Sequence, residues 1–87
     1  MKLKYDFVVR SVADKMVAIP VGDATEDFNC MITLNESGAF IFELLKEEIS
    51  EERLLEAFLN EYDATPEQAK NTIQSVLAKL YKSDILQ

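Results

Sequence analysis

The chain has 87 residues, 48% of them hydrophobic, with 16 acidic and 9 basic side chains and a net charge of −7. This length leaves room for one domain, residues 1–87, with a small core. With no histidine and a single cysteine, Cys30, the sequence excludes Ser-His-Asp and Cys-His catalysis, an internal disulfide and a thiolate zinc site. We expect no enzyme, no cofactor and no metal. A cytoplasmic location is expected, since no segment resembles a signal peptide or reaches the roughly 20 apolar residues of a membrane span.

Three short strands are predicted in the first 34 residues. Residues 7–12 and 15–21 are rich in β-branched side chains and are separated by a short polar break, which favours a hairpin. Residues 28–34 alternate between apolar and polar side chains, which is typical of a half-buried strand. Cys30 falls on the apolar side of that strand and is interpreted as a small core residue.

Three capped amphipathic helices are predicted to follow. Asn35 is placed to cap the first helix directly after the third strand, and Ser50 is placed to cap the second. The strongest local signal is Thr65, which is followed by a proline and then by Gln68, the pattern of a capping box. Phe42 lies off the main apolar stripe of its helix and is expected to pack on the sheet. The last helix is expected to end near residue 82 or 83.

The charge is distributed unevenly along the chain. Residues 1–34 carry 4 basic and 5 acidic groups (net −1), residues 35–67 carry 2 and 10 (net −8), and residues 68–87 carry 3 and 1 (net +2). A nucleic-acid-binding protein normally presents a basic surface to phosphates. The acidic middle third therefore argues against a nucleic-acid partner.

These elements predict an α+β domain with a winged helix-turn-helix-like architecture: a three-stranded antiparallel sheet followed by three helices. The last two helices have the spacing of a helix-turn-helix, which is most often a DNA-binding motif. The charge distribution opposes that interpretation, and a winged helix with all its strands before its helices has an unusual order.

Three segments give the chain a resemblance to a known family. The first is residues 34–45 (LNESGAFIFELL) together with the strand that leads into them. The others are residues 49–59 (ISEERLLEAFL) and residues 76–80 (VLAKL) of the last helix. The chain resembles the PqqD-like family, named after pyrroloquinoline quinone (PQQ) biosynthesis protein D. Its members are also called RiPP recognition elements (RiPP: ribosomally synthesised, post-translationally modified peptide). Residues 46–50 lack the aspartate–glycine turn and the threonine that family members often have before the second helix, but Ser50 can cap as threonine does.

The resemblance implies a non-catalytic, chaperone-like, peptide-binding domain. Such a domain binds the leader of a precursor peptide as an extra strand against strand three, in the groove beside the last helix. It presents the leader to a modifying enzyme such as a radical-SAM protein, in PQQ or other modified-peptide biosynthesis. The alternative is a winged-helix protein-interaction or transcription-regulatory module. No membrane partner is expected, and a homodimer through the strand edge or by segment exchange stays open.

The same resemblance implies a set of peptide-binding residues. They are Met31, Ile32 and Thr33 at the strand edge, Leu77, Ala78 and Tyr81 as apolar sockets, and Gln74 and Lys82 as polar contacts. Three of these residues also suit a purely structural role. Leu77 suits the core, Tyr81 suits either role, and the N-terminal hairpin could cover Met31. Lys70, Lys79 and Lys82 are further candidates for salt-sensitive contacts with an acidic leader.

Overall fold

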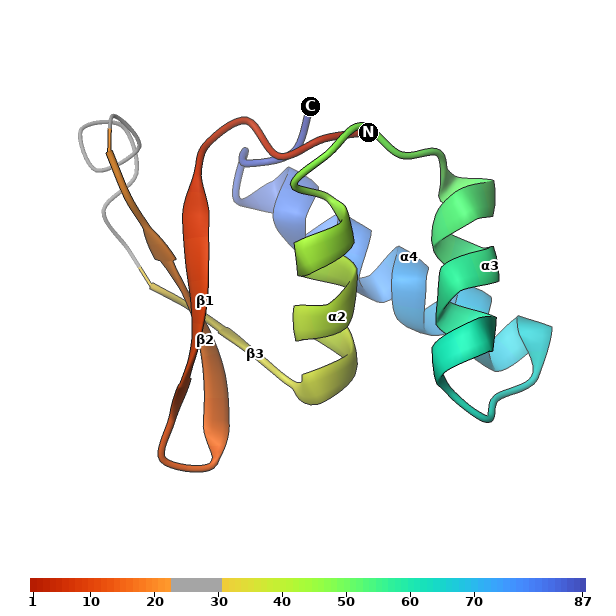
Figure 1. Ribbon diagram of the computed structural model, residues 1–87. Helices are drawn as coiled ribbons and strands as arrows, with labels where there is room; N and C mark the ends of the chain where they lie inside the picture. Colours follow the sequence, from red (N-terminus) through yellow and green to blue (C-terminus); the bar gives the residue numbers. More distant parts are fainter. Residues whose placement is uncertain (23–30) are drawn as a thin grey trace.

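The structure is a computed structural model and describes residues 1–22 and 31–87 (Figure 1). Its elements are the strands β1 (Phe7–Val12), β2 (Lys15–Pro20) and β3 (Ile32–Leu34), then the helices α2 (Glu36–Leu44), α3 (Glu51–Glu61) and α4 (Pro66–Lys82). The predicted α+β fold is confirmed. The predicted third strand begins at residue 28, whereas β3 begins at Ile32. The predictions for Phe28 and Cys30 lie outside the described residues.

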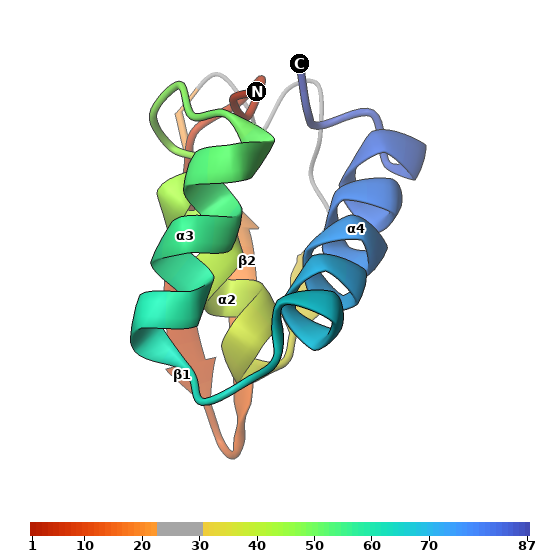
Figure 2. The ribbon, with the colours of Figure 1, turned by 90° about the vertical axis from the view of Figure 1, so that its right-hand side faces the viewer.

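The three strands form an antiparallel sheet in the order β1-β2-β3. In its register Val9 is opposite Ala18, which is also opposite Ile32, so these side chains share the face of the sheet that meets the helices. Helix α2 lies against that face, and α3 and α4 pack against α2 and against each other (Figures 1 and 2). No helix in the described part of the chain is long and apolar enough to span a bilayer.

A two-residue turn joins β1 to β2. Val12 is opposite Lys15 in the register, so Ala13 and Asp14 form the tip of the hairpin. Ala13 has a φ of 58°, in the left-handed region that costs a residue with a Cβ about 1–2 kcal/mol. Tight hairpin turns often need such an angle, which is why glycine is common in them.

We expect Ala13→Gly to raise the free energy of unfolding by about 0.5–1 kcal/mol, because glycine adopts this angle without the clash of a Cβ. Urea denaturation followed by circular dichroism measures the change. Ala78→Gly is the matched control, since Ala78 is an exposed residue inside α4. There the same chemical change should lower the stability by about 1 kcal/mol. A loss of stability in both variants would contradict the strain at Ala13.

All three predicted helix caps are confirmed. The side chains of Asn35, Ser50 and Thr65 each accept a hydrogen bond from the backbone N–H three residues later. The Gln68 side chain also accepts from the Thr65 N–H at 3.1 Å, which completes the predicted capping box. Each cap satisfies backbone donors that a helix leaves free at its start. The helices therefore begin where the sequence indicates.

The C-terminal end of α4 closes in a Schellman motif. The Ile85 N–H donates to the Leu80 carbonyl at 3.2 Å and the Asp84 N–H to the Tyr81 carbonyl at 3.0 Å. Asp84 takes the left-handed position, with a φ of 59°. Its carboxylate is paired with Lys4, and this hydrogen bond raises the pKa of the Lys4 ammonium. The motif thereby joins the end of α4 to the N-terminal segment.

The core lies between the sheet and the three helices. Phe42, on α2, is fully buried, and its ring meets the ring of Phe7, on β1, edge to face at 5.2 Å. The prediction that Phe42 packs on the sheet is confirmed. The two chain ends close the core through a bridge between Leu3 and Leu86, both buried together with Ile85. No local pattern in the sequence indicates a role for these last three residues.

Candidate functional site

Strand β3 is one edge of the sheet, and hydrogen-bond alternation shows which way its backbone faces. The Val21 N–H donates to the Asp6 carbonyl at 3.0 Å, which makes them a bonded pair in the register of β1 and β2. Bonded and non-bonded pairs alternate in an antiparallel ladder, so β2 turns its even-numbered residues toward β3. Ile32 and Leu34 therefore bond to β2, and the N–H and C=O of Thr33 point away from the sheet.

A second observation supports this direction for Thr33. Its carbonyl accepts a hydrogen bond from Lys79 Nζ, on α4, at 3.1 Å. Within the described residues, no strand lies beyond β3 on this side. An outward-facing N–H and C=O on an edge strand can bind an extended chain. Among residues 1–22 and 31–87, nothing pairs with this edge as a strand, and the backbone of Thr33 can take one.

A small pocket lies where β3 ends, between that strand and α4. It has a volume of about 170 Å³ and is lined by Leu34, Asn35 and Gly38 on one side and by Ser75, Val76, Lys79 and Leu80 on α4. Leu34 and Leu80 are buried and Val76 is half-buried, which gives the pocket an apolar floor. An apolar side chain from an added strand has a place to bind here.

Gly38 shapes the wall of this pocket. The Asn35 side chain folds back over α2 and accepts from the Gly38 N–H at 2.7 Å. A Cβ on Gly38 would lie only 2.9 Å from the Asn35 side-chain oxygen and 3.7 Å from Leu34. The glycine therefore lets the cap close tightly at the point where the strand becomes the helix.

The structure places the eight predicted peptide-binding residues in two different environments, buried and exposed. Ile32 and Leu77 are buried, with 8% and 5% of their surface exposed, so their side chains belong to the core. Met31 and Tyr81 are large apolar residues that are 66% and 52% exposed. The other four, Thr33, Gln74, Ala78 and Lys82, are exposed as well. Leu77 therefore has the core role, and the hairpin does not cover Met31.

The two flanks of α4 face different neighbours. A helix turns by about 100° per residue, so Gln74 and Tyr81 project about 140–160° from Lys79, on the side of Lys70. Lys70 lines a pocket toward α3, whereas Lys79 reaches β3. Lys82 projects about 60° from Lys79 but about 160° from buried Leu80, so it points toward solvent beside that flank.

The structure thus places Met31 and Thr33 at the β3 edge and Lys82 on the exposed side of α4, and leaves Gln74 and Tyr81 on the other flank of α4. Ala78 lies between the two flanks. The sequence-based choice omitted Ser75 and Val76 and named Lys79 only as a source of charge. Spacing along the helix separates the two flanks, but no sequence signal indicates which flank meets β3.

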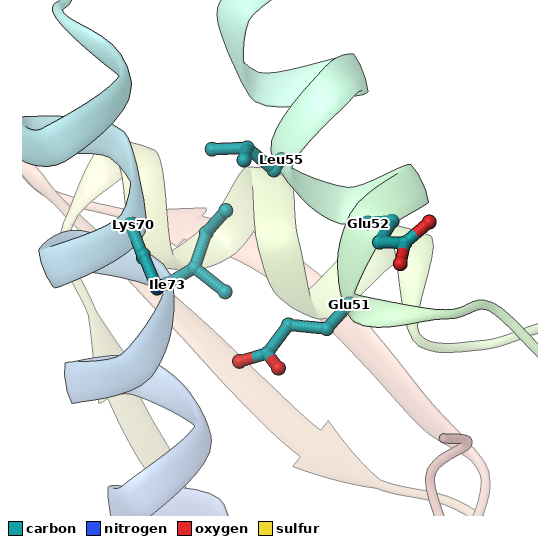
Figure 3. A pocket seen from close by; sticks show the side chains of 5 residues that line it. All are labelled: Glu51, Glu52, Leu55, Lys70 and Ile73. Carbon is teal, nitrogen blue, oxygen red and sulfur yellow. The ribbon is translucent and has the colours of Figure 1, made fainter.

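A second pocket lies between α3 and α4, on the flank away from β3. It has a volume of about 200 Å³ and is lined by Glu51, Glu52, Leu55, Lys70 and Ile73. Figure 3 shows the side chains of Leu55 and Ile73 directed toward each other across it, while the carboxylate of Glu52 turns away. Its apolar floor and acidic rim make it a separate surface from the β3 edge.

The acidic residues of α2 and α3 influence the ionisation of Tyr62, at the C-terminal end of α3. Tyr62 is the C-cap residue of α3. It is half-buried and packs against the rings of Phe40 and Phe58. Burial raises the pKa of the Tyr62 hydroxyl, and the nearby carboxylates of Glu36 and Glu61 raise it further.

Comparisons with known proteins identify the family. The profile of the family described as "Coenzyme PQQ synthesis protein D (PqqD)" matches residues 16–86. The chain belongs to the PqqD family. The PqqD profile begins within β2 and so includes β3, α4 and the whole of the groove between them. The predicted resemblance is confirmed.

One solved structure that resembles this PqqD-family chain is described as "TbiB1 in Complex with the TbiA(beta) Leader Peptide". The two chains are 21% identical with a TM-score of 0.75, and the match covers 100% of this chain and 95% of that chain. At this level of identity the likeness shows a shared fold. A search of curated proteins found no match.

Proposed function

We propose that this PqqD-family protein is a non-catalytic domain that binds the leader of a ribosomally made precursor peptide and presents it to a modifying enzyme. The observation that carries the proposal is the outward-facing backbone of Thr33 on β3, beside a small pocket between the end of β3 and α4 whose floor is apolar. The similarly folded TbiB1, which is bound to a leader peptide, supports the same conclusion.

The binding mode is the addition of a strand to β3. An extended leader exchanges N–H and C=O hydrogen bonds with Thr33, and its side chains alternate between the outer face of the sheet and the side of α4. On the α4 side the pocket at Leu34, Val76 and Leu80 receives an apolar side chain. Met31, which precedes β3, adds apolar surface on the outer face.

The surface of α3 suits a protein partner other than the leader. Residues 35–67 carry a net charge of −8, and the pocket between α3 and α4 has an apolar floor formed by Leu55 and Ile73. We propose that a modifying enzyme, such as a radical-SAM protein in the cytoplasm, binds this face while the leader occupies the β3 edge. A second copy of the chain that paired through β3 would compete with the leader.

The test is an NMR titration of the ¹⁵N-labelled protein with a synthetic leader from the precursor encoded beside its gene. We expect the largest shifts at Met31, Thr33 and the α4 flank from Ser75 to Lys82, and small shifts along α3. Duplex DNA serves as the comparison. Shifts of α4 with DNA and none with the leader would overturn the proposal and favour a regulatory winged helix.

A further inference from the structure

A lysine bonds to the backbone acceptor that an added strand would use. Lys79 Nζ lies 3.1 Å from the Thr33 carbonyl oxygen and joins α4 to β3 across 46 residues of sequence. That carbonyl faces the outer edge of the sheet, where the N–H of an incoming strand would donate. The Lys79 ammonium therefore lies at the same oxygen, on the path by which the leader backbone would approach.

The partner of Lys79 is a neutral carbonyl rather than a carboxylate. Among the described residues, Lys4 pairs with Asp84 and Lys46 with Glu43, whereas Lys79 has no ion pair. An ammonium bonds more strongly to a carboxylate than to a neutral oxygen. Lys79 is thus held near the edge by a contact that a negative group can replace.

We propose that Lys79 is a displaceable latch that makes the β3 edge selective for leaders with an aspartate or glutamate facing α4. The proposal rests on the proposed leader binding and adds a rule about the leader's sequence. When the leader adds, its backbone N–H takes the Thr33 carbonyl, and Lys79 moves to the leader carboxylate. A leader with a neutral side chain there displaces the latch without giving Lys79 a new partner.

The geometry indicates where the acidic residue must be. The leader residue opposite Thr33 shares the outer face of the sheet, so its two neighbours point to the opposite side, toward α4. The neighbour nearer Leu34 faces the pocket, which Lys79 helps to line. The acidic side chain is therefore one residue away from the position paired with Thr33, within reach of Lys79.

The test is a double-mutant cycle. Isothermal titration calorimetry compares wild type, Lys79→Met and Lys70→Met with the synthetic leader of the neighbouring precursor and with variants in which each Asp or Glu becomes Asn or Gln. Lys70 is the control because it lies on the flank that faces α3. At one acidic position of the leader, we expect the neutral substitution to weaken binding about fivefold to wild type and to Lys70→Met. The same substitution in the leader should not weaken its binding to Lys79→Met.

A second measurement tests the latch in the absence of the leader. Lys79→Met should change the ¹³C shift of the Thr33 carbonyl, and Lys70→Met should leave it unchanged. Equal coupling of Lys70 and Lys79 to the leader, or no acidic position that couples to Lys79, would overturn the latch while leaving leader binding intact. If wild type binds no leader at all, both the proposed function and the latch are overturned.

Discussion

Replacing Thr33 by proline should weaken leader binding by more than about tenfold while the domain stays folded. Proline has no N–H, and its ring would fill the space beside β3 where the leader backbone must approach. The fold should tolerate the change, because Thr33 is exposed on an edge strand and its N–H points away from β2. Calorimetry with the leader measures the loss, and circular dichroism checks the fold.

Two controls separate the backbone from other causes. Thr33→Val keeps the N–H and should bind the leader as wild type does, which excludes a role for the hydroxyl. Ser11→Pro places the same ring on β1, the other edge of the sheet, where hydrogen-bond alternation also turns the Ser11 N–H outward. Ser11→Pro should bind normally. Normal binding by Thr33→Pro would refute strand addition at β3.

The sequence allows the secondary structure to be predicted wherever the signal is local. The caps at Asn35, Ser50 and Thr65 are confirmed because each depends on one side chain and the backbone three residues later. The position of Phe42 off the helix stripe predicts that it packs on the sheet, and its contact with Phe7 confirms this. Apolar patterns likewise predict the family, which the match over residues 16–86 confirms.

The site can be predicted only in part, because it depends on how α4 is rotated against the sheet. The buried stripe of α4 has a polar flank on each side, with Lys70 on one and Lys79 on the other. Both flanks have the same helical spacing, so the sequence does not show which of them faces β3. The long-range contact of Lys79 with Thr33 shows that it is the flank of Lys79. The burial of Leu3, Ile85 and Leu86 likewise depends on the meeting of the two chain ends, which no local pattern indicates.

The largest effect on stability is expected for Phe42→Ala, which should lower the free energy of unfolding by about 3–5 kcal/mol. Phe42 is fully buried and connects α2 to β1 through the ring of Phe7. A domain of this size has a total stability of only about 5–15 kcal/mol, so a large fraction of the variant could be unfolded. Urea denaturation followed by circular dichroism measures the loss.

Phe40→Ala is the matched control on the same helix, and the leader adds a second test. Phe40 is half-buried and meets Phe58 and Tyr62 at 6.3 and 5.5 Å, so its loss should cost about 1–2 kcal/mol. Equal losses for the two variants would contradict the central place of Phe42 in the core.

Because α2 begins directly after β3, a ligand bound to β3 stabilises the folded state that Phe42→Ala weakens. Leader at a hundred times its wild-type Kd should therefore restore about 2.7 kcal/mol to Phe42→Ala, and about 1.4 kcal/mol or less to a Phe42→Ala, Thr33→Pro double variant, whose affinity for the leader is at least about tenfold weaker.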